Sequence, residues 1–233
     1  MQTSVALVTG GSRGLGRALA SALSDRGWRL VLDGRDTGRL AAAVAALPSP
    51  ELVTAVPGDV ADPAHRAALA AAVGPRLDLL VHNAGDLGPS PLVPLAGLAP
   101  ERFTRLLAVN TVAPLALTQQ LLPALRRTGG RVVSISSDAA VEAYAGWGGY
   151  GASKAALDQL TAVLAVENPA LRVHSLDPGD MATEMHQAAY PDEDVSDRPS
   201  PESVVPALLR LLDDDVPTGR HRAADLLPAG AGR

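Results

Sequence analysis

Residues 5–23, Val-Ala-Leu-Val-Thr-Gly-Gly-Ser-Arg-Gly-Leu-Gly-Arg-Ala-Leu-Ala-Ser-Ala-Leu, decide which fold this chain adopts. The first four are apolar, which predicts a short strand buried on both faces. A glycine-rich turn and a segment with helical periodicity follow, and the free N–H groups at the start of a helix bind phosphate. We therefore expect a phosphate-binding loop, in which Gly10 permits the tight turn, Gly14 lets the backbone approach pyrophosphate and Gly16 lets the helix pack on the strand.

Apolar runs alternate with helical segments along the rest of the chain. Strands are expected at 28–33, 52–56, 77–81, 130–135 and 171–176, with 218–224 as an edge strand. The helices between them include a long one from 100 to about 127 and a last one at 202–212. This alternation predicts right-handed βαβ units. The predicted fold class is α/β: a Rossmann-type, doubly wound parallel sheet of about seven strands flanked by helices, with residues 1–233 forming a single domain.

Composition excludes several classes of protein. The 233 residues carry a formal net charge of −5, so no basic patch for nucleic acid or an anionic membrane is expected. The sequence contains no cysteine, which excludes disulfides and thiolate metal sites and fits a reducing cytoplasm. We expect a cytoplasmic protein, because there is no signal segment and no apolar run of the ~18 residues that a membrane span needs. No metal site is expected.

A second motif lies at Tyr150 and Lys154, four residues apart at the start of a segment that reads as helix. Because residues i and i+4 share one face of a helix, the phenol and the ammonium group come together. A fixed cation stabilises a phenolate, so we expect Lys154 to lower the pKa of Tyr150. A tyrosine tuned in this way can exchange a proton with a carbinol oxygen, which Ser137, thirteen residues upstream, could also hydrogen-bond. Lys154 is the only lysine beside nineteen arginines, and a buried, tunable ammonium group is a task for lysine rather than arginine.

These motifs resemble the active site of the short-chain dehydrogenases/reductases. Thr-Gly-x-x-x-Gly-x-Gly at 9–16, and Ser137 followed by Tyr150-x-x-x-Lys154, are similar to the signatures of that family, and the resemblance covers about residues 4–183. It implies hydride exchange between a nicotinamide cofactor and a carbonyl or secondary alcohol. It further implies that Tyr150 donates the proton, that Lys154 also contacts the nicotinamide ribose, that Ser137 orients the carbonyl oxygen and that Asn110 anchors a proton relay.

The end of the second expected strand discriminates between the two nicotinamide cofactors. An acidic side chain there accepts the ribose hydroxyls of NAD(H), while an arginine favours the 2′-phosphate of NADP(H). The resemblance puts Gly34 at the acidic position, Arg35 at the basic one and Arg13 as a second phosphate contact, so NADP(H) is expected. A shift of one residue would put Asp33 at the acidic position and favour NAD(H) instead.

Other expected cofactor contacts also follow the ends of strands. Asp59-Val60 resembles the family's adenine-contacting turn, 82–85 is close to its Asn-Asn-Ala-Gly, and 178–183 resembles the Pro-Gly-x-x-x-Thr segment that flanks the nicotinamide. His82, which replaces the first Asn, is expected to be a packed neutral histidine. The full predicted set is Gly10, Ser12, Arg13, Gly14, Leu15, Gly16, Arg35, Asp59, Val60, Asn83, Ala84, Gly85, Tyr150, Lys154, Pro178, Gly179, Met181 and Thr183.

The substrate is the least determined part of the prediction. Residues 184–201 have little apolar content and are expected to form a substrate lid. Tyr144 and Trp147 could line the substrate pocket or only pack. The main hypothesis is a ketoreductase that acts on a small-molecule carbonyl or alcohol. The alternatives are a regulator that binds nicotinamide without turnover and an epimerase on the same scaffold. Because relatives commonly pair the helices near 101–127 and 150–167, we expect a homodimer or homotetramer.

Overall fold

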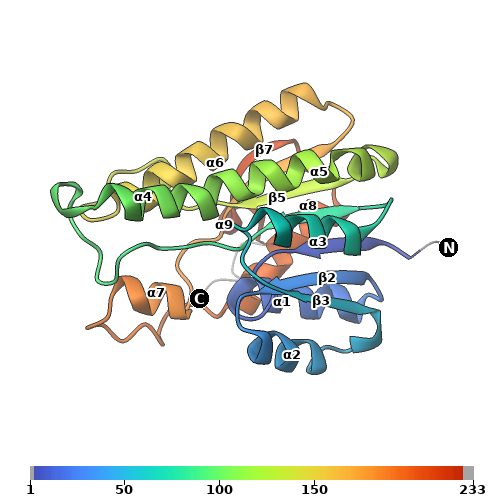
Figure 1. The fold of residues 1–233 in the computed structure, drawn as a ribbon, viewed down its shortest axis with the longest axis horizontal. Helices are drawn as coiled ribbons and strands as arrows, with labels where there is room; N and C mark the ends of the chain where they lie inside the picture. The colour runs from blue at the N-terminus through green and yellow to red at the C-terminus, as the bar shows by residue number, and fades with distance from the viewer. Residues whose placement is uncertain (1–2, 228–233) are drawn as a thin grey trace.

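Seven strands form one parallel sheet in the computed structural model, which describes residues 3–227 (Figure 1). Their order is β3-β2-β1-β4-β5-β6-β7, so the direction in which strands are added reverses between β1 and β4. The strands are β1 (Val5–Val8), β2 (Arg29–Gly34), β3 (Val53–Pro57), β4 (Leu79–His82), β5 (Arg131–Ile135), β6 (Arg172–Asp177) and β7 (Gly219–Arg222). The predicted fold class is confirmed, and the expected edge strand pairs in parallel with β6, His174 lying opposite Gly219.

Helices cover both faces of the sheet (Figure 1). One face packs against α3 (Pro63–Val73), α5 (Ala113–Thr128) and α6 (Gly148–Glu167), and the other against α1 (Gly14–Asp25), α2 (Thr37–Ala45) and α8 (Val205–Asp213). Strand β1 is apolar throughout because it contributes to the hydrophobic cores on both faces of the sheet. Val5 and Leu7 pack in the core beneath α3 and α5, while Ala6 and Val8 pack in the core beneath α1 and α8. Successive side chains of a strand point to opposite faces, and both faces of this one are covered.

Shorter helical segments connect these elements. They are η1 (Pro50–Leu52), η2 (Leu95–Gly97), α4 (Pro100–Leu107), η3 (Ala108–Val112), η4 (Asp138–Ala140), α7 (Glu184–Ala189), η5 (Pro201–Val204) and α9 (Ala223–Leu226). The long helix expected from 100 to about 127 is present as α4 and α5, but the π-helical turn η3 interrupts it and holds Asn110 fully buried. Such turns re-aim side chains and are frequent at functional sites.

Residues 184–201 begin with α7, which lies beyond the carboxyl ends of the strands (Figure 1). Ala189 and Val195 are buried, and Ser90 donates a hydrogen bond of 2.7 Å to the carbonyl of Ala188. The segment therefore packs against the loop that follows β4. Across the described residues, no helix combines the length and the apolarity needed to cross a bilayer.

Candidate active site

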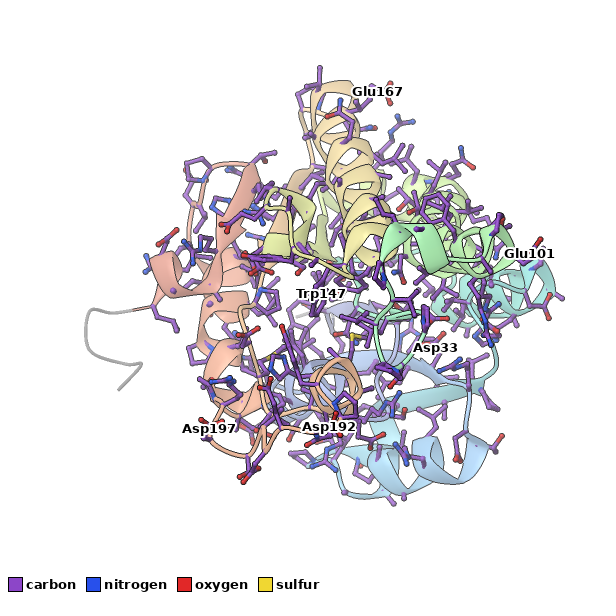
Figure 2. The ribbon with its side chains drawn as sticks, turned by 90° about the vertical axis from the view of Figure 1, so that its left-hand side faces the viewer. Asp33, Glu101, Trp147, Glu167, Asp192 and Asp197 are labelled. Carbon is purple, nitrogen blue, oxygen red and sulfur yellow. The ribbon has the colours of Figure 1, made fainter. Side chains whose placement is uncertain are left out.

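A cleft of about 720 Å³ opens at the carboxyl ends of the strands, where ligands bind in open α/β sheets. Figure 2 looks toward this edge, with Trp147 near the centre of the view and Asp33 below it. Most predicted site residues line the cleft: Gly10, Ser12, Arg13, Gly14, Leu15, Arg35, Asp59, Val60, Asn83, Ala84, Gly85, Ser137, Tyr150, Lys154, Pro178, Gly179, Met181 and Thr183. Two predicted residues, Gly16 and Asn110, lie behind this lining.

The glycine loop leaves the start of α1 without a side-chain cap. The side chain of the N-cap residue, Arg13, makes no hydrogen bond to this helix, and the first turn has no acidic residue, so neither compensates the positive end of the helix dipole. Gly10 and Gly14 have φ of 69° and 52°, a left-handed conformation that favours glycine. A Cβ on Gly16 would lie 2.4 Å from the carbonyl oxygen of Gly10. The loop therefore brings bare backbone close to the cleft.

Asn83 ties this loop to the end of β4. Its Nδ2 donates to the carbonyls of Thr9 at 2.9 Å and Gly10 at 3.1 Å, while Oγ1 of Thr9 accepts from the N–H groups of Asn83 and Ala84. The neighbouring His82 is buried, with Nε2 2.8 Å from Oγ1 of Thr118. Burial lowers the pKa of His82 to about 3, so the expected neutral histidine is confirmed.

Asp33 lines the cleft, but both of its carboxylate oxygens have partners within the protein. Its Oδ1 accepts a hydrogen bond of 2.5 Å from the N–H of Gly10, and its Oδ2 lies 3.1 Å from Nε2 of His65. The residue is 1% exposed. Both carboxylate oxygens therefore have protein partners, and Asp33 supports the glycine loop from beneath.

Two arginines at one end of the cleft share a carboxylate from the expected lid. Nη1 of Arg39 lies 2.7 and 2.9 Å from the two oxygens of Glu184, and Arg13 binds the same carboxylate. Hydrogen bonding to Arg39, together with the charges of both arginines, holds the pKa of Glu184 below its usual value although desolvation opposes this. Arg35 lines the cleft and is exposed. Sequence reasoning missed Arg39, which lies in the first turn of α2, just after the loop that holds Arg35.

The expected adenine turn is held by a second arginine that sequence reasoning missed. Arg105 on α4 bonds Oδ2 of Asp59 through Nη2 at 2.5 Å, and Oδ1 of Asp59 accepts from the N–H of Ala61 at 2.9 Å. Partial burial raises the pKa of Asp59, but these two hydrogen bonds outweigh it and lower the pKa. Asp59 is therefore a fixed anion at the wall of the cleft.

Tyr150 and Lys154 lie one turn apart at the start of α6, and the structure brings their side chains together. Nζ of Lys154 lies 5.6 Å from the centroid of the Tyr150 ring and donates a hydrogen bond of 2.8 Å to the carbonyl of Ile135, the last residue of β5. Both residues are buried. Burial lowers the pKa of Lys154 to about 8, although the charge of Asp158 opposes this.

The pKa of Tyr150 corrects one expectation. Burial raises it above the ordinary value, the charges of Asp138 and Asp177 raise it further, and hydrogen bonding to Ser137 opposes them. The expected lowering by Lys154 is therefore wrong for this structure, because burial and the two nearby carboxylates disfavour the phenolate more than hydrogen bonding to Ser137 favours it. Nζ of Lys154 is committed to a backbone carbonyl. The phenol is consequently protonated at neutral pH, as a proton donor must be.

Ser137 is anchored on three sides. Its hydroxyl donates to Oδ1 of Asp138 at 2.9 Å and accepts from the N–H of Ala139 at 3.2 Å. Its backbone carbonyl accepts a hydrogen bond of 2.9 Å from Nη2 of Arg220 on β7. The guanidinium of Arg220 also binds Asp158 on α6 and Asp177 at the end of β6. An arginine in a short edge strand belongs to no local motif, so the sequence did not reveal it.

Asn110 joins the loop after β4 to α6. Its Nδ2 donates to the carbonyl of Asp86 and to Oγ of Ser153, and its Oδ1 accepts from the N–H of Asp86. A Cβ on Gly85 would lie 3.7 Å from this Oδ1 and 3.8 Å from Nζ of Lys154. Asn110 and Lys154 therefore flank the same glycine, and the part of Asn110 in a proton relay stays a prediction.

The fold and the cleft define the class of α/β proteins that bind a dinucleotide at a switch in strand order. The sequence profile of the short chain dehydrogenase family matches residues 4–194. The chain belongs to the short-chain dehydrogenase/reductase family.

Individual relatives match over most of their length. The uncharacterized oxidoreductase YciK of Escherichia coli K12 is 33% identical over 223 residues, 91% of this chain and 86% of that protein. A rhamnolipids biosynthesis 3-oxoacyl-(acyl-carrier-protein) reductase of Pseudomonas aeruginosa is 35% identical over 198 residues, 78% of this chain and 74% of that protein. The crystal structure of a short-chain dehydrogenase from Escherichia coli CFT073 complexed with NADPH has a TM-score of 0.88 at 31% identity and covers 96% of this chain and 97% of that one.

Proposed function

We propose that the protein is an NADP(H)-dependent ketoreductase that exchanges a hydride between the nicotinamide and a carbonyl or secondary alcohol. The observation that carries this proposal is the grouping of Ser137, Tyr150 and Lys154 in a cleft that begins at the glycine loop. The relative complexed with NADPH supports the choice of cofactor, and the 3-oxoacyl reductase supports the reaction type.

The residues present fit a dinucleotide. The uncapped start of α1 supplies N–H groups and a positive dipole end for a pyrophosphate. The glycines of the loop keep Cβ atoms out of the path of those groups. Also lining the cleft, Oγ of Ser136 is buried without a hydrogen-bond partner in the part of the chain that the structure describes. A buried polar atom of this kind is costly unless a ligand or water satisfies it.

Two further observations favour NADP(H) over NAD(H). Arg13 and Arg39 already hold an anion, the carboxylate of Glu184, and a 2′-phosphate is an anion of similar bonding geometry. Asp33, whose acidic side chain would have favoured NAD(H), is instead committed to Gly10 and His65. Arg35, which lines the same end of the cleft, completes a basic site for the phosphate.

The chain's own residues then manage the proton. The bound cofactor supplies the hydride. Tyr150, protonated at neutral pH because burial raises its pKa, donates its proton to the carbonyl oxygen of the substrate. Ser137 orients that oxygen with a hydroxyl that the N–H of Ala139 holds in place. Lys154, whose pKa burial lowers to about 8, remains largely cationic at pH 7 and holds its ammonium group 5.6 Å from the centroid of the Tyr150 ring.

A panel of ketones and quinones assayed with NADPH at 340 nm tests this function. Steady loss of NADPH that requires the carbonyl supports it. NADPH binding without consumption of any carbonyl would instead identify a nicotinamide-binding regulator. Conversion of a hydroxyl centre without net NADPH loss would identify an epimerase.

The lid, the oligomer and the location are further parts of the proposal. We infer that residues 184–201 close over the substrate in a chain of one domain, since α7 carries the Glu184 that binds Arg13 and Arg39. We also infer a homodimer or homotetramer, because Val112 and Leu115, and Val163 and Val166 on α6, expose apolar surface. A cytoplasmic location stays a prediction.

A further inference from the structure

Aromatic side chains are rare in this chain and gather in one place. The sequence has three tyrosines, two tryptophans and one phenylalanine. All three tyrosines and one of the tryptophans, Trp147, line the cleft. The core is built instead almost entirely from leucine, valine and alanine. Aromatic rings elsewhere dominate protein cores, so their position here indicates a use at the cleft.

Three rings form a wall beside the proton donor. The ring of Trp147 lies 5.6 Å from that of Tyr150 at an interplanar angle of 73° and 6.1 Å from that of Tyr190 at 46°. Both distances fall in the range of favourable aromatic pairs. Leu87 and Met185 pack with them. Trp147 and Tyr190 are only partly buried, so ring surface faces the cleft next to the phenol that would meet a carbonyl oxygen.

His186 adds a polar atom without a partner to this wall. The imidazole lines the cleft, its side chain is 10% exposed, and its ring lies 5.1 Å from that of Tyr190. Nδ1 lies 3.7 Å from Oδ1 of Asp180. Nε2 is buried and has no hydrogen-bond partner among residues 3–227. Such an atom is expected to accept a hydrogen bond from a ligand.

Several carboxylates lie around the wall, and the ammonium group of Lys154 lies 5.6 Å from the centroid of the Tyr150 ring. Asp138 follows Ser137 directly, and the carboxylate of Asp180 lies beside His186. The hydroxyl of Tyr144 lies 3.1 Å from the carboxylate of Asp138 and 2.7 Å from that of Glu142. The arginines that line the cleft are already paired with carboxylates, Arg13 with Glu184 and Arg105 with Asp59. The carboxylates around the wall would repel an anionic substrate, whereas a neutral substrate would not meet that repulsion.

Resting on the proposed function, we propose that the substrate is a neutral aryl ketone or aryl aldehyde whose ring stacks on the wall of Trp147 and Tyr190. A hydroxyl or N–H group on the far side of that ring donates to Nε2 of His186. Trp147 and Tyr190 are then specificity-determining residues for the reaction, and Tyr150 and Ser137 hold the carbonyl oxygen.

Matched ketones test the stacking. Binding of acetophenone and of cyclohexyl methyl ketone to the NADP⁺-loaded protein is measured by calorimetry, and reduction of both by NADPH loss. Two ring contacts of a few-fold each should give acetophenone an advantage of about tenfold in Kd. Trp147→Leu should remove most of that advantage, while Phe103→Leu, whose ring does not line the cleft, should keep it. Each variant is compared with the parent by the ratio of its values for the two ketones, so the intrinsic reactivity of each carbonyl cancels.

A second pair of ligands tests His186. 4′-Hydroxyacetophenone should bind several-fold more tightly than 4′-methoxyacetophenone, and 4′-carboxyacetophenone should bind more weakly than both. His186→Phe keeps a ring beside Tyr190 but removes Nε2, so it should abolish the preference for the hydroxyl without abolishing the preference for the ring.

The outcomes separate this inference from the proposed function. Ring-selective binding without any reduction would overturn the proposed function alone. Reduction of both ketones with equal Kd values, or an advantage that survives Trp147→Leu, would overturn the aryl-substrate inference alone. Tightest binding by the carboxylate would also overturn it.

Discussion

Arg220 and Ser137 are 83 residues apart in the sequence, yet Nη2 of Arg220 donates a hydrogen bond of 2.9 Å to the backbone carbonyl of Ser137. The same guanidinium binds Asp158 and Asp177, so one arginine links the last strand to α6, β6 and the candidate catalytic serine. Arg220 also lies beyond the residues matched by the family profile, which end at 194. The closing strand therefore supports the active site from outside the recognised motifs.

Replacing Arg220 with Met should impair catalysis more than cofactor binding. Ser137 loses an anchor, and the uncompensated charge of Asp177 raises the pKa of Tyr150 further. We expect turnover to fall by about tenfold, as a lost hydrogen bond to a charged group allows, with an unchanged Kd for NADPH. In the alcohol-oxidising direction, the rising limb of the pH–rate profile should move to higher pH. Arg220→Lys should rescue part of the loss, and Arg222→Met on the same strand should have no effect. A loss of stability with unchanged kinetics would count against this positioning role.

Tyr150→Phe removes the proton donor and keeps the ring. Turnover should fall by at least the ~10²–10⁴ that general acid catalysis contributes, while NADPH binds normally because the glycine loop and the arginines are untouched. Lys154→Arg should also fail, since a guanidinium does not fit where Nζ reaches the carbonyl of Ile135. The two variants are compared by turnover of a carbonyl from the panel and by NADPH titration. A Tyr150→Phe protein that works at near-parental rate would exclude this mechanism.

Glu184→Gln should strengthen the binding of NADP(H). The carboxylate of Glu184 occupies Arg13 and Arg39, and a 2′-phosphate would have to displace it. Exposed ion pairs contribute little, so the gain in affinity should be about two- to fivefold and should shrink at high salt. Arg39→Gln should weaken NADP(H) binding, and neither variant should change NAD(H) binding. Glu193→Gln, an exposed residue of the same segment, is the matched control. Equal changes for both cofactors would contradict the assignment of this end of the cleft.

Acid should destabilise the protein through its buried histidines. Burial lowers the pKa of His82 to about 3 and that of His174 to about 4, from 6.5 in each case. Below pH 6.5 the unfolded chain takes up protons that the folded chain does not, so the free energy of unfolding is full above pH 6.5 and falls toward pH 4. The slope is at most about 1.4 kcal/mol per pH unit for each histidine. Urea unfolding at pH 7.5 and pH 5 measures it, and His82→Asn should reduce it. Identical slopes in parent and variant would rule out His82 as the cause.

Val166→Glu should weaken the proposed oligomer. The side chain lies on α6 and the residue is 82% exposed, so a charge there would be desolvated only in an interface. Light scattering should show smaller particles for the variant at micromolar concentration. Val141→Glu, at a residue 62% exposed outside the two paired helices, should leave particle size unchanged. A parent protein that is already monomeric would refute the oligomer itself.

The sheet was predictable because its causes are local. Buried parallel strands need apolar runs, and the turn before α1 needs glycine at Gly10 and Gly14, where φ is positive. The meeting of Tyr150 and Lys154 follows from helical spacing alone. Even β7 could be expected, although its sequence, Gly-Arg-His-Arg, has no apolar pattern.

The remaining features depend on residues far apart in the chain. Glu184 meets Arg39 across 145 residues, and no periodicity encodes that contact. The raised pKa of Tyr150 depends on burial and on carboxylates contributed by two other segments, Asp138 and Asp177, which sequence spacing cannot weigh. The π-helical turn at Asn110 was likewise hidden, because the same residues would also fit a regular helix.

The single lysine makes the candidate active site open to selective chemical modification. Lys154 carries the only side-chain amine in the sequence, and burial brings its pKa to about 8, so a substantial fraction is the nucleophilic free base in mildly alkaline solution. An amine-selective acylating reagent small enough to enter the cleft would modify one side chain, at the residue that we propose acts beside Tyr150. Modification and inactivation would then follow one time course, and any molecule that fills the cleft would slow both.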